Sequence, residues 1–253
     1  RGMLRRSAVQ FKSFKKKIYL QLFRQFGFQK KIFFQAADDT EQKDVLRYFG
    51  SKAKVKLVPN FPAKSSENLL PLQKNPGDLF VLYVGRIHPI KNLDYLLQIL
   101  RKSASKIRLT IVGSVEDPGF WHQCRQMIDN LPRSITVTYM GEMPNDRLPD
   151  VLKDNHIFSL PTKGENFGHA IFEALSFGKP VLISDQTPWR NLEHAKAGWD
   201  IPLEKPEQFE HAIAEASAWG QDEYNIWSKN AFDFARRSID VPHLKQQYRE
   251  LFS

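Results

Sequence analysis

The pattern of apolar and polar positions divides the chain into two parts. Between residues 10 and 27 the apolar residues recur at helical spacing and form one stripe, with the lysines mostly outside it. From residue 79 onward, short apolar runs of strand length alternate with longer stretches of helical spacing. Strands that alternate with helices are typical of a parallel, doubly wound sheet. The predicted fold class is therefore α/β, with a Rossmann-like sheet.

The element boundaries follow from this pattern and from the turn residues between the runs. Strands are predicted at residues 31–35, 55–58, 79–84, 107–112, 135–140, 156–160 and 181–184, with a short extended piece at 199–203. Helices are predicted at residues 10–27, from a cap at 38–40 to residue 49, and at 92–103, 118–131, 146–153, 168–177, 206–219, 223–237 and 241–252. The stretch 61–78 is rich in Pro, Ser and Asn, and we place a domain boundary there.

The net charge of +9 comes from the N-terminal segment. Residues 1–37 contain ten Lys or Arg and no acid, whereas the remaining 216 residues carry 27 basic and 28 acidic groups. The stripe at 10–27 fits either a basic helix on an anionic membrane or an ordinary domain helix packed on a sheet. No recognition motif or set of stacking aromatics accompanies the charge, so no nucleic-acid partner is predicted.

Three absences in the sequence bear on the compartment. No apolar run of about 18 residues is present, and no secretory signal follows the basic N-terminus. The single cysteine, Cys124, excludes an internal disulfide and is expected to be a packed thiol. A reducing compartment is the simplest interpretation. We therefore expect a cytoplasmic protein, with peripheral contact to the inner face of the membrane as the alternative.

Two cations follow the predicted strand 79–84. Gly85 allows the backbone to approach a ligand closely, and Arg86 and Lys91 come before a predicted helix N-terminus, which itself favours anions. A guanidinium fork and an ammonium point charge together suit a diphosphate. The alternative is that both are surface residues at a turn.

The stretch 161–180 combines a glycine loop with Glu165, an apolar helix with Glu173, and a Gly-Lys-Pro stop. Such a loop lies at the carboxyl end of a strand, where open α/β sheets bind ligands. The two carboxylates suit either acid–base chemistry or acceptance of hydrogen bonds from sugar hydroxyls. Seven residues separate them, which matches no metal-binding spacing. Backbone amides between them are expected to form an anion-binding nest, namely those of Asn166, Phe167 and Gly168.

Further along, the polar loop 185–192 contains Trp189. This loop either closes over a ligand or is a capped loop with an anchoring tryptophan. His169, on the first turn of the same helix as Glu173, is expected to be a phosphate neighbour or a surface residue. The other histidines show no metal-ligand spacing.

At these residues the chain resembles glycosyltransferase family 4, the retaining, nucleotide-sugar-dependent group with the GT-B architecture. The segment VGRIHPIKNLDYLL is similar to that family's donor-phosphate turn, and ENFGHAIFEALSFGKPV is similar to its E-x7-E signature. The run Thr138 to Gly141, followed by Leu148, resembles the strand and loop that hold the nucleobase. The resemblance covers essentially the whole chain.

The resemblance implies a role for each matching residue. Arg86 and Lys91 would neutralise the leaving diphosphate, and Glu165 would hold the hydroxyls of the transferred sugar. Glu173 would accept hydrogen bonds from the ribose. The backbone amides of residues 166–168 would contact sugar and phosphate. Further donor-binding positions are expected at Gly85, Gly141, Met143 and Leu148. No divalent metal and no cofactor are implied, because the cations and the helix N-terminus replace the metal.

The resemblance also implies a domain arrangement and a partner set. Residues 1–62 would be the end of an acceptor domain, 63–237 the donor domain, and 238–253 a helix that returns to the first domain. The expected partners are a nucleotide-sugar donor and a glycan or lipid-linked acceptor of a cell-surface polysaccharide. Because the family's first domain is longer, the sequence is interpreted as a fragment that binds donor better than it turns over. A non-catalytic nucleotide-sugar-binding module and a GT-B-type sugar-nucleotide epimerase are the alternatives. A phosphorylase would need a segment with a cofactor-binding lysine, and this sequence contains no recognisable segment of that kind.

Overall fold

A computed structural model describes residues 19–23, 25–28, 32–36, 39–58, 69, 72–238 and 241–252. The chain divides into two compact units, Arg1–Phe61 with Ile239–Ser253, and Pro62–Ser238. Each unit is described separately below. Residues 10–18, the first half of the expected basic helix, lie outside the described residues, whereas residues 19–23 are helical.

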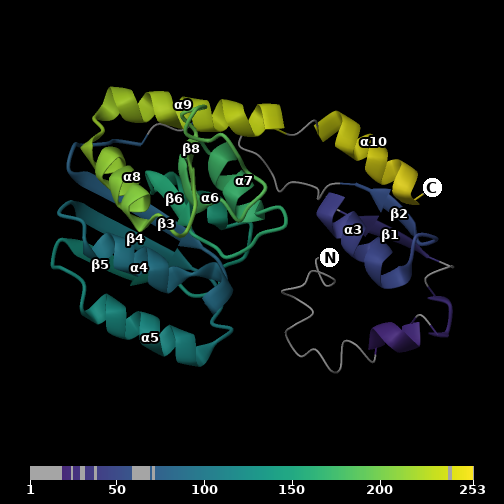
Figure 1. Cartoon of the computed structure of the whole chain (residues 1–253). Helices are drawn as coiled ribbons and strands as arrows, with labels where there is room; N and C mark the ends of the chain where they lie inside the picture. Colours follow the sequence, from purple (N-terminus) through teal and green to yellow (C-terminus); the bar gives the residue numbers. More distant parts are fainter. Residues whose placement is uncertain are drawn as a thin grey trace. The chain divides into compact units, whose positions relative to one another are not determined.

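The larger unit is a doubly wound parallel sheet (Figure 1). In chain order its elements are β3 (Asp78–Val84), η2 (Pro89–Lys91), α4 (Leu93–Arg101), β4 (Lys106–Val112), α5 (Pro118–Asp129), β5 (Ile135–Tyr139), α6 (Leu148–Lys153), β6 (Ile157–Leu160), α7 (His169–Ser176), β7 (Val181–Ser184), β8 (Gly198–Ile201), α8 (Pro206–Ala218) and α9 (Gln221–Ser238). The six strands lie in the order β5-β4-β3-β6-β7-β8, and all their pairings are parallel. The predicted α/β fold class is confirmed.

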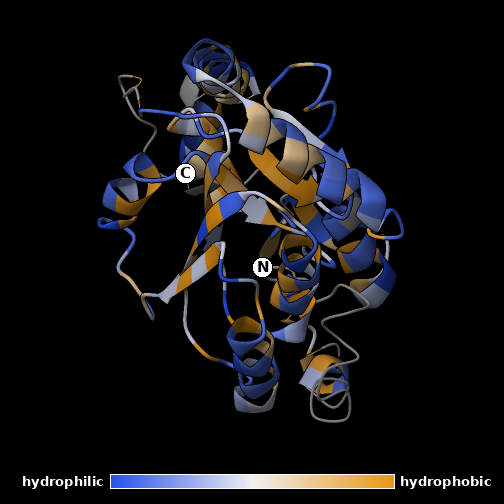
Figure 2. Cartoon of the chain, turned by 90° about the vertical axis from the view of Figure 1, so that its left-hand side faces the viewer, coloured by the Kyte–Doolittle hydropathy of each residue, from blue (hydrophilic) through white to orange (hydrophobic). Residues whose placement is uncertain are grey.

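Helices cover the sheet from both sides. Helices α4, α5 and α8 pack together on one face, and α7 and α9 pack together on the other. Strands β6 and β7 are buried at every position, as expected for strands covered on both faces. In Figure 2 the strands near the centre of this unit are coloured hydrophobic, whereas the helices around them carry many hydrophilic residues. The apolar runs that predicted the strands are therefore buried in the structure.

Several helix boundaries differ from the predicted ones for local reasons. Helix α4 begins at Leu93 rather than at residue 92, because Asn92 is left-handed with φ 60°. Helix α7 begins at His169 rather than at residue 168, because Gly168 is also left-handed, with φ 75°. The extended piece expected at 199–203 is strand β8, which pairs with β7 from Gly198 to Ile201.

The smaller unit contains a two-stranded parallel sheet with a helix on each face. Strand β1 (Phe33–Ala36) pairs with β2 (Lys54–Leu57), and α3 (Asp39–Phe49) connects them. Phe34 stacks on Phe49 of α3 at a ring-centroid distance of 4.8 Å. The next residue, Gln35, points to the other face and donates to Tyr248 Oη of α10 (Val241–Phe252) at 3.0 Å. The C-terminal helix thus packs on the sheet formed by the chain's N-terminal part.

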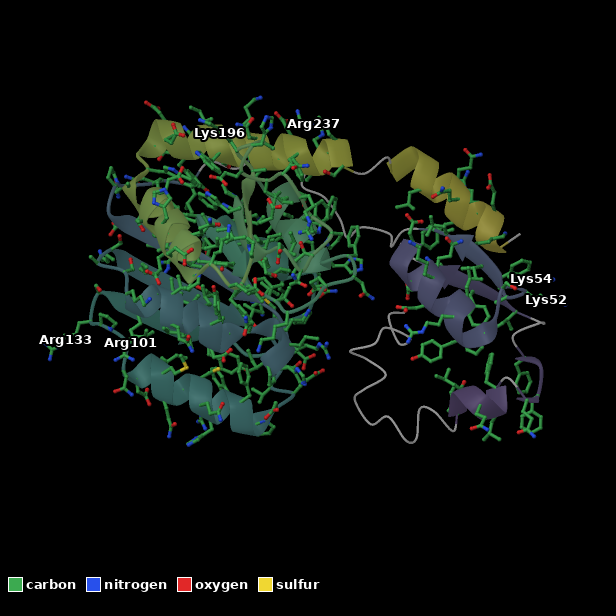
Figure 3. The ribbon with its side chains drawn as sticks, viewed as in Figure 1. Lys52, Lys54, Arg101, Arg133, Lys196 and Arg237 are labelled. Carbon is green, nitrogen blue, oxygen red and sulfur yellow. The ribbon has the colours of Figure 1, made fainter. Side chains whose placement is uncertain are left out.

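Basic side chains of the larger unit are spread over several elements. Figure 3 shows Arg101 and Arg133 projecting from one side, whereas Lys196 and Arg237 lie near α9. These four labelled side chains therefore do not gather in one place.

Candidate functional site

The strand order brings the two predicted loops to one point of the sheet edge. Strands β3 and β6 are neighbours, and the chain leaves them in opposite directions, toward β4 and toward β7. This is the topological switch point at which open α/β sheets bind ligands. The turn after β3 carries Gly85, Arg86 and Lys91, and the loop after β6 carries Glu165. The sheet topology therefore assembles residues that are 74 positions apart.

Hydrogen bonds join these two loops. The carbonyl oxygen of Ile90 accepts a bond from the amide of Lys163 at 2.8 Å and one from Thr162 Oγ1 at 3.0 Å. Thr162 is completely buried. On the other side of the turn, the phenol of buried Tyr83 contacts the carbonyl oxygen of Lys91 at 3.5 Å. Contacts with two neighbouring segments thus hold the backbone around Lys91.

Lys91 and Glu165 form an ion pair between Nζ and Oε1. The two side chains are only 12% and 17% exposed, so the charges compensate each other in a largely desolvated place. The amide of Glu165 donates to Gln186 O of the next loop at 2.9 Å. The cation predicted for the phosphate and the carboxylate predicted for the sugar are therefore in contact with each other.

Arg86 makes a more exposed pair. Its Nη1 lies 2.6 Å from Glu116 Oε2, and the two side chains are 54% and 39% exposed. Backbone bonds fix the loop that carries Glu116: Ile87 donates to Ser114 O at 2.8 Å, and Asp117 donates to Ile87 O at 3.1 Å. No local pattern indicates Glu116 as a partner of Arg86, because the contact depends on this loop-to-loop pairing.

A glycine permits the pairing of these two loops. A Cβ on Gly113 would lie 2.0 Å from the carbonyl oxygen of Gly85, so no other residue fits there. Gly85 itself has room for a Cβ, whose nearest atoms would lie at 3.5 Å. Of the two glycines that end β3 and β4, close approach therefore requires Gly113, which our sequence reasoning did not single out. The signal was present, because both strands end in Val-Gly.

Three successive backbone amides precede helix α7. Within the described residues, no acceptor within hydrogen-bonding distance is found for the N–H groups of Asn166, Phe167 and Gly168. Gly168 is the N-cap of α7 and supplies no side-chain cap. The first turn of a helix leaves further N–H groups without an internal partner. The arrangement has the donors of the predicted anion nest, next to Glu165 and Lys91.

Glu173 lies on the inner side of α7 and is 9% exposed. Its burial raises the pKa of the carboxyl to about 7. It is the fifth residue of the helix, little more than one turn from its start. Its burial excludes a solvated side chain on the outer face of the helix.

Glu173 lines a pocket of about 310 Å³ together with Leu148. The rest of the lining is apolar except for two residues of the loop before α6, and it consists of Asn145, Asp146, Pro149, Leu152 and Phe177. The structure thus brings together two of the predicted donor-binding residues, Glu173 and Leu148. A hollow of this size and character suits a flat organic ring with a polar edge.

Met143 and Gly141 lie differently. Met143 lines a separate hollow of about 600 Å³ with Arg108, Thr110 and other residues. The α6 residues that line this second hollow are Asp150 and Val151, whereas Leu148, Pro149 and Leu152 of the same helix line the pocket of Glu173. Gly141 accepts a bond from the Gly113 amide at 2.8 Å through its carbonyl oxygen. The structure therefore does not bring Met143 to the pocket of Glu173.

Trp189 is an anchor. Its side chain is 6% exposed, and Nε1 donates to the carbonyl oxygen of Phe167 at 2.6 Å. Of the two alternatives for the loop 185–192, the anchoring tryptophan is therefore the one observed. His169 is exposed, and its ring centroid lies 4.8 Å from that of Phe167.

Other candidate chemistry is limited. Cys124 is a buried free thiol, and burial raises its pKa to about 12, so the packed-thiol prediction is confirmed. The described part of the chain contains no group of three or more His, Cys, Asp or Glu that could hold a metal ion. A search of these same residues finds no helix with the length and apolarity that a membrane span needs.

Comparison with known proteins agrees with this geometry. The model of the family described as glycosyl transferases group 1 matches residues 66–234. The chain belongs to this family. The match covers both loops, both glutamates and the loop with Trp189.

Two relatives are named as a D-inositol 3-phosphate glycosyltransferase and an O-antigen chain mannosyltransferase. A D-inositol 3-phosphate glycosyltransferase of Rhodococcus erythropolis is 31% identical over 120 residues, 44% of this chain and 27% of its own length. The O-antigen chain mannosyltransferase B of Escherichia coli is 32% identical over 114 residues, 43% of this chain and 29% of its own length. The aligned part is thus less than a third of either relative.

A solved structure shows the same fold. HepE of Anabaena, in complex with UDP and glucose, superposes with a TM-score of 0.64 at 17% identity, over 86% of this chain and 62% of its own. This family and its structural neighbours establish a GT-B, Rossmann-like fold for the chain.

Proposed function

We propose that this chain carries the donor-binding part of a retaining glycosyltransferase of family 4. It would transfer a hexosyl group from a nucleotide-sugar to a glycan or lipid-linked acceptor during the synthesis of a cell-surface polysaccharide. The relatives' names support a role in glycan synthesis, and the family match supports a glycosyltransferase. Retention, the donor and the acceptor belong to the proposal.

One observation carries the proposal. At the switch point of the sheet, the Lys91–Glu165 pair lies beside three backbone amides without acceptors, at the N-terminus of α7. Farther along the same helix, Glu173 lines a pocket. A nucleotide-sugar presents the same sequence of chemistry: sugar hydroxyls, a diphosphate, a ribose and a base. The elements of the site therefore occur in the order in which such a donor requires them.

The proposed mechanism is stabilisation of the leaving group. Charge develops on the diphosphate as the bond from the sugar to the phosphate breaks, and Lys91, Arg86 and the amides before α7 neutralise it. Glu165 accepts hydrogen bonds from the sugar hydroxyls and orients the ring. Glu173 accepts hydrogen bonds from the ribose. No metal ion is proposed, because two cations and a helix N-terminus supply the positive charge.

Donor binding would exchange the contacts of the ion pair. Lys91 and Glu165 contact each other in the structure. In the proposed complex, a diphosphate takes over Lys91, while the sugar hydroxyls take over Glu165. Both partners exchange one charged contact for another, so neither is left desolvated and unpaired.

Two alternatives remain, a non-catalytic nucleotide-sugar-binding module and a sugar-nucleotide epimerase. Sugar transfer by the whole protein would separate the first from the enzyme. An epimerase would convert its donor with no acceptor present, so product analysis without acceptor would identify it. Contact of residues 1–31 with anionic membranes is a further proposal, because most of that segment lies outside the described residues. Co-sedimentation of the full-length enzyme with anionic vesicles tests it.

Calorimetry of this chain against uridine, guanosine and adenosine diphosphates tests the central proposal. We expect one of them to bind, and binding of none by the folded chain would contradict it. Arg86→Ala should weaken the diphosphate about 10-fold or more, the effect of one charge-assisted hydrogen bond, and leave the nucleoside within about twofold. Equal loss for diphosphate and nucleoside would contradict the role of Arg86.

A further inference from the structure

The loop after β7 holds both ends of the segment that carries the unpaired amides. At one end the Glu165 amide donates to Gln186 O at 2.9 Å. At the other end Trp189 Nε1 donates to Phe167 O at 2.6 Å. Residues 165–167 are therefore held at both ends by hydrogen bonds to a single neighbouring loop. The second bond comes from the Trp189 side chain, so a substitution can remove it without changing the loop backbone.

The hydrogen bond from Trp189 to the Phe167 carbonyl oxygen also fixes the N–H group of the same peptide. The carbonyl of Phe167 and the N–H of Gly168 belong to one planar trans peptide, so they point in opposite directions. Once the indole fixes the carbonyl, the N–H of Gly168 must point away from Trp189. Gly168 has φ 75°, a left-handed conformation that glycine adopts without strain. Without a fixed carbonyl, this peptide could rotate at low cost.

The indole itself has little freedom. Trp189 stacks on Phe172 of α7 with 6.0 Å between ring centroids, and its backbone amide lies 3.2 Å from Thr187 Oγ1. Phe234 of α9 lies on it at 6.4 Å, and Phe167 meets it edge-on at 5.6 Å. Packed aromatic surfaces on several sides hold the ring, so its N–H has one direction.

We propose that Trp189 is a positioning residue, whose indole N–H orients the Phe167–Gly168 peptide so that the Gly168 amide donates to the donor's diphosphate. This inference rests on the proposed function of the site and adds a residue to it. Trp189 touches no substrate. It acts through the peptide that it holds, and its loss affects phosphate binding rather than base or ribose binding.

The chain offers a matched control. Trp227 of α9 is also buried, at 4% exposure, and its Nε1 donates to Glu223 Oε1 at 2.9 Å. It packs among other tryptophans rather than against the 165–168 segment. Trp189→Phe and Trp227→Phe each remove one indole N–H bond and keep an aromatic ring. A general effect of losing such a bond would appear in both variants, as a similar decrease in melting temperature.

The experiment compares the two variants by calorimetry with the nucleoside diphosphate that the wild type binds and with its nucleoside. Trp189→Phe should weaken the diphosphate about 5- to 20-fold, as expected when a buried acceptor loses its donor. It should leave the nucleoside within about twofold, and Trp227→Phe should change neither ligand beyond that. Equal effects of Trp189→Phe on both ligands, or no effect on either, would overturn the inference.

A second measurement needs no ligand. In ¹⁵N-labelled protein, the amide resonance of Gly168 should shift in Trp189→Phe and stay in place in Trp227→Phe. An unmoved Gly168 resonance in Trp189→Phe would contradict the inference even if affinity changes. A wild-type chain that binds no nucleoside diphosphate would contradict the proposed function instead, so the two failures are distinguishable.

Discussion

The two glutamates of the site differ in how the burial of a carboxylate is compensated. Glu165 and Glu173 are both largely removed from water, and an ionised carboxylate in such a place needs compensation. Glu165 has a cation, because Lys91 reaches it from the neighbouring loop. No Lys or Arg pairs with Glu173 in the described structure, and its pKa rises to about 7. One carboxylate is thus compensated by a cation, whereas the burial of the other favours its protonated form.

The difference suits the two roles proposed for them. A sugar ring that must be transferred needs an acceptor with a fixed position, and the ion pair with Lys91 holds the Glu165 side chain in place. A ribose needs only to be held, and an acceptor that gains its charge on binding is sufficient. Substitutions of the carboxylates and of their partners test this comparison, and their expected effects differ in size.

The largest effect is expected from Lys91→Met, which leaves Glu165 desolvated without its cation. Removing one partner of a buried pair costs on the order of 3 kcal/mol. Thermal unfolding should report this loss, and calorimetry should show diphosphate affinity about 100-fold lower or more, since the main phosphate cation is absent. Lys196→Met is the control, because it removes the same charge from an exposed pair with Glu223.

The double variant Lys91→Met with Glu165→Gln sharpens this test. Without the carboxylate, no unpaired charge remains, so most of the stability should return while diphosphate binding stays weak. If stability did not return, the loss would reflect packing of the lysine stem rather than charge.

A smaller, pH-dependent effect is expected at Glu173. If the ionised form accepts the ribose hydroxyls, a group with a pKa of about 7 makes nucleoside affinity rise about tenfold between pH 6 and pH 8. Glu173→Gln should abolish this rise. The nucleoside is the better ligand for this calorimetric test, because it lacks phosphates that titrate in the same range. Persistence of the rise in Glu173→Gln would assign it to another group.

The same group makes a prediction for stability. The folded-state pKa of Glu173 is raised, so its protonated form favours folding; this contribution is complete below the ordinary pKa of 4.5 and is lost as pH rises through about 7. Relative to wild type, Glu173→Gln should therefore become progressively more stable in thermal melts as pH increases from 5 to 8. A difference that does not depend on pH would mean that Glu173 is ionised in the folded protein.

The sequence predicts the residues of each loop because their signals are local. The helical pattern around Glu173 and the glycines near Glu165 are such signals, and both loops follow apolar runs predicted as parallel strands. That these two strands are neighbours, which places Lys91 near Glu165, comes from the strand order in the structure.

Contacts that depend on loop pairing were not predictable in this way. Thr162 and Trp189 act through bonds to backbone carbonyls of other segments, and nothing in their local pattern indicates the acceptor. The resemblance implies donor-binding roles for both Met143 and Leu148, yet the two line different hollows. Leu148 is the first residue of α6 and Met143 lies in the loop before it, so the path of this loop decides where Met143 lies.

The smallest effect is expected at a third carboxylate, Glu116, whose pair with Arg86 is exposed. Exposed pairs contribute about 0–1 kcal/mol, so Glu116→Gln should leave the melting temperature nearly unchanged. It should release Arg86 for the diphosphate and tighten binding about two- to threefold at low salt, with the gain lost at high salt because the charges are screened. Glu210→Gln is the matched control, since Glu210 pairs with Lys102 at 2.7 Å on other elements. Weaker diphosphate binding by Glu116→Gln would instead mean that Glu116 holds Arg86 in the position that binding needs. The different exposure of the two ion pairs would then not explain the different roles of Glu116 and Glu165.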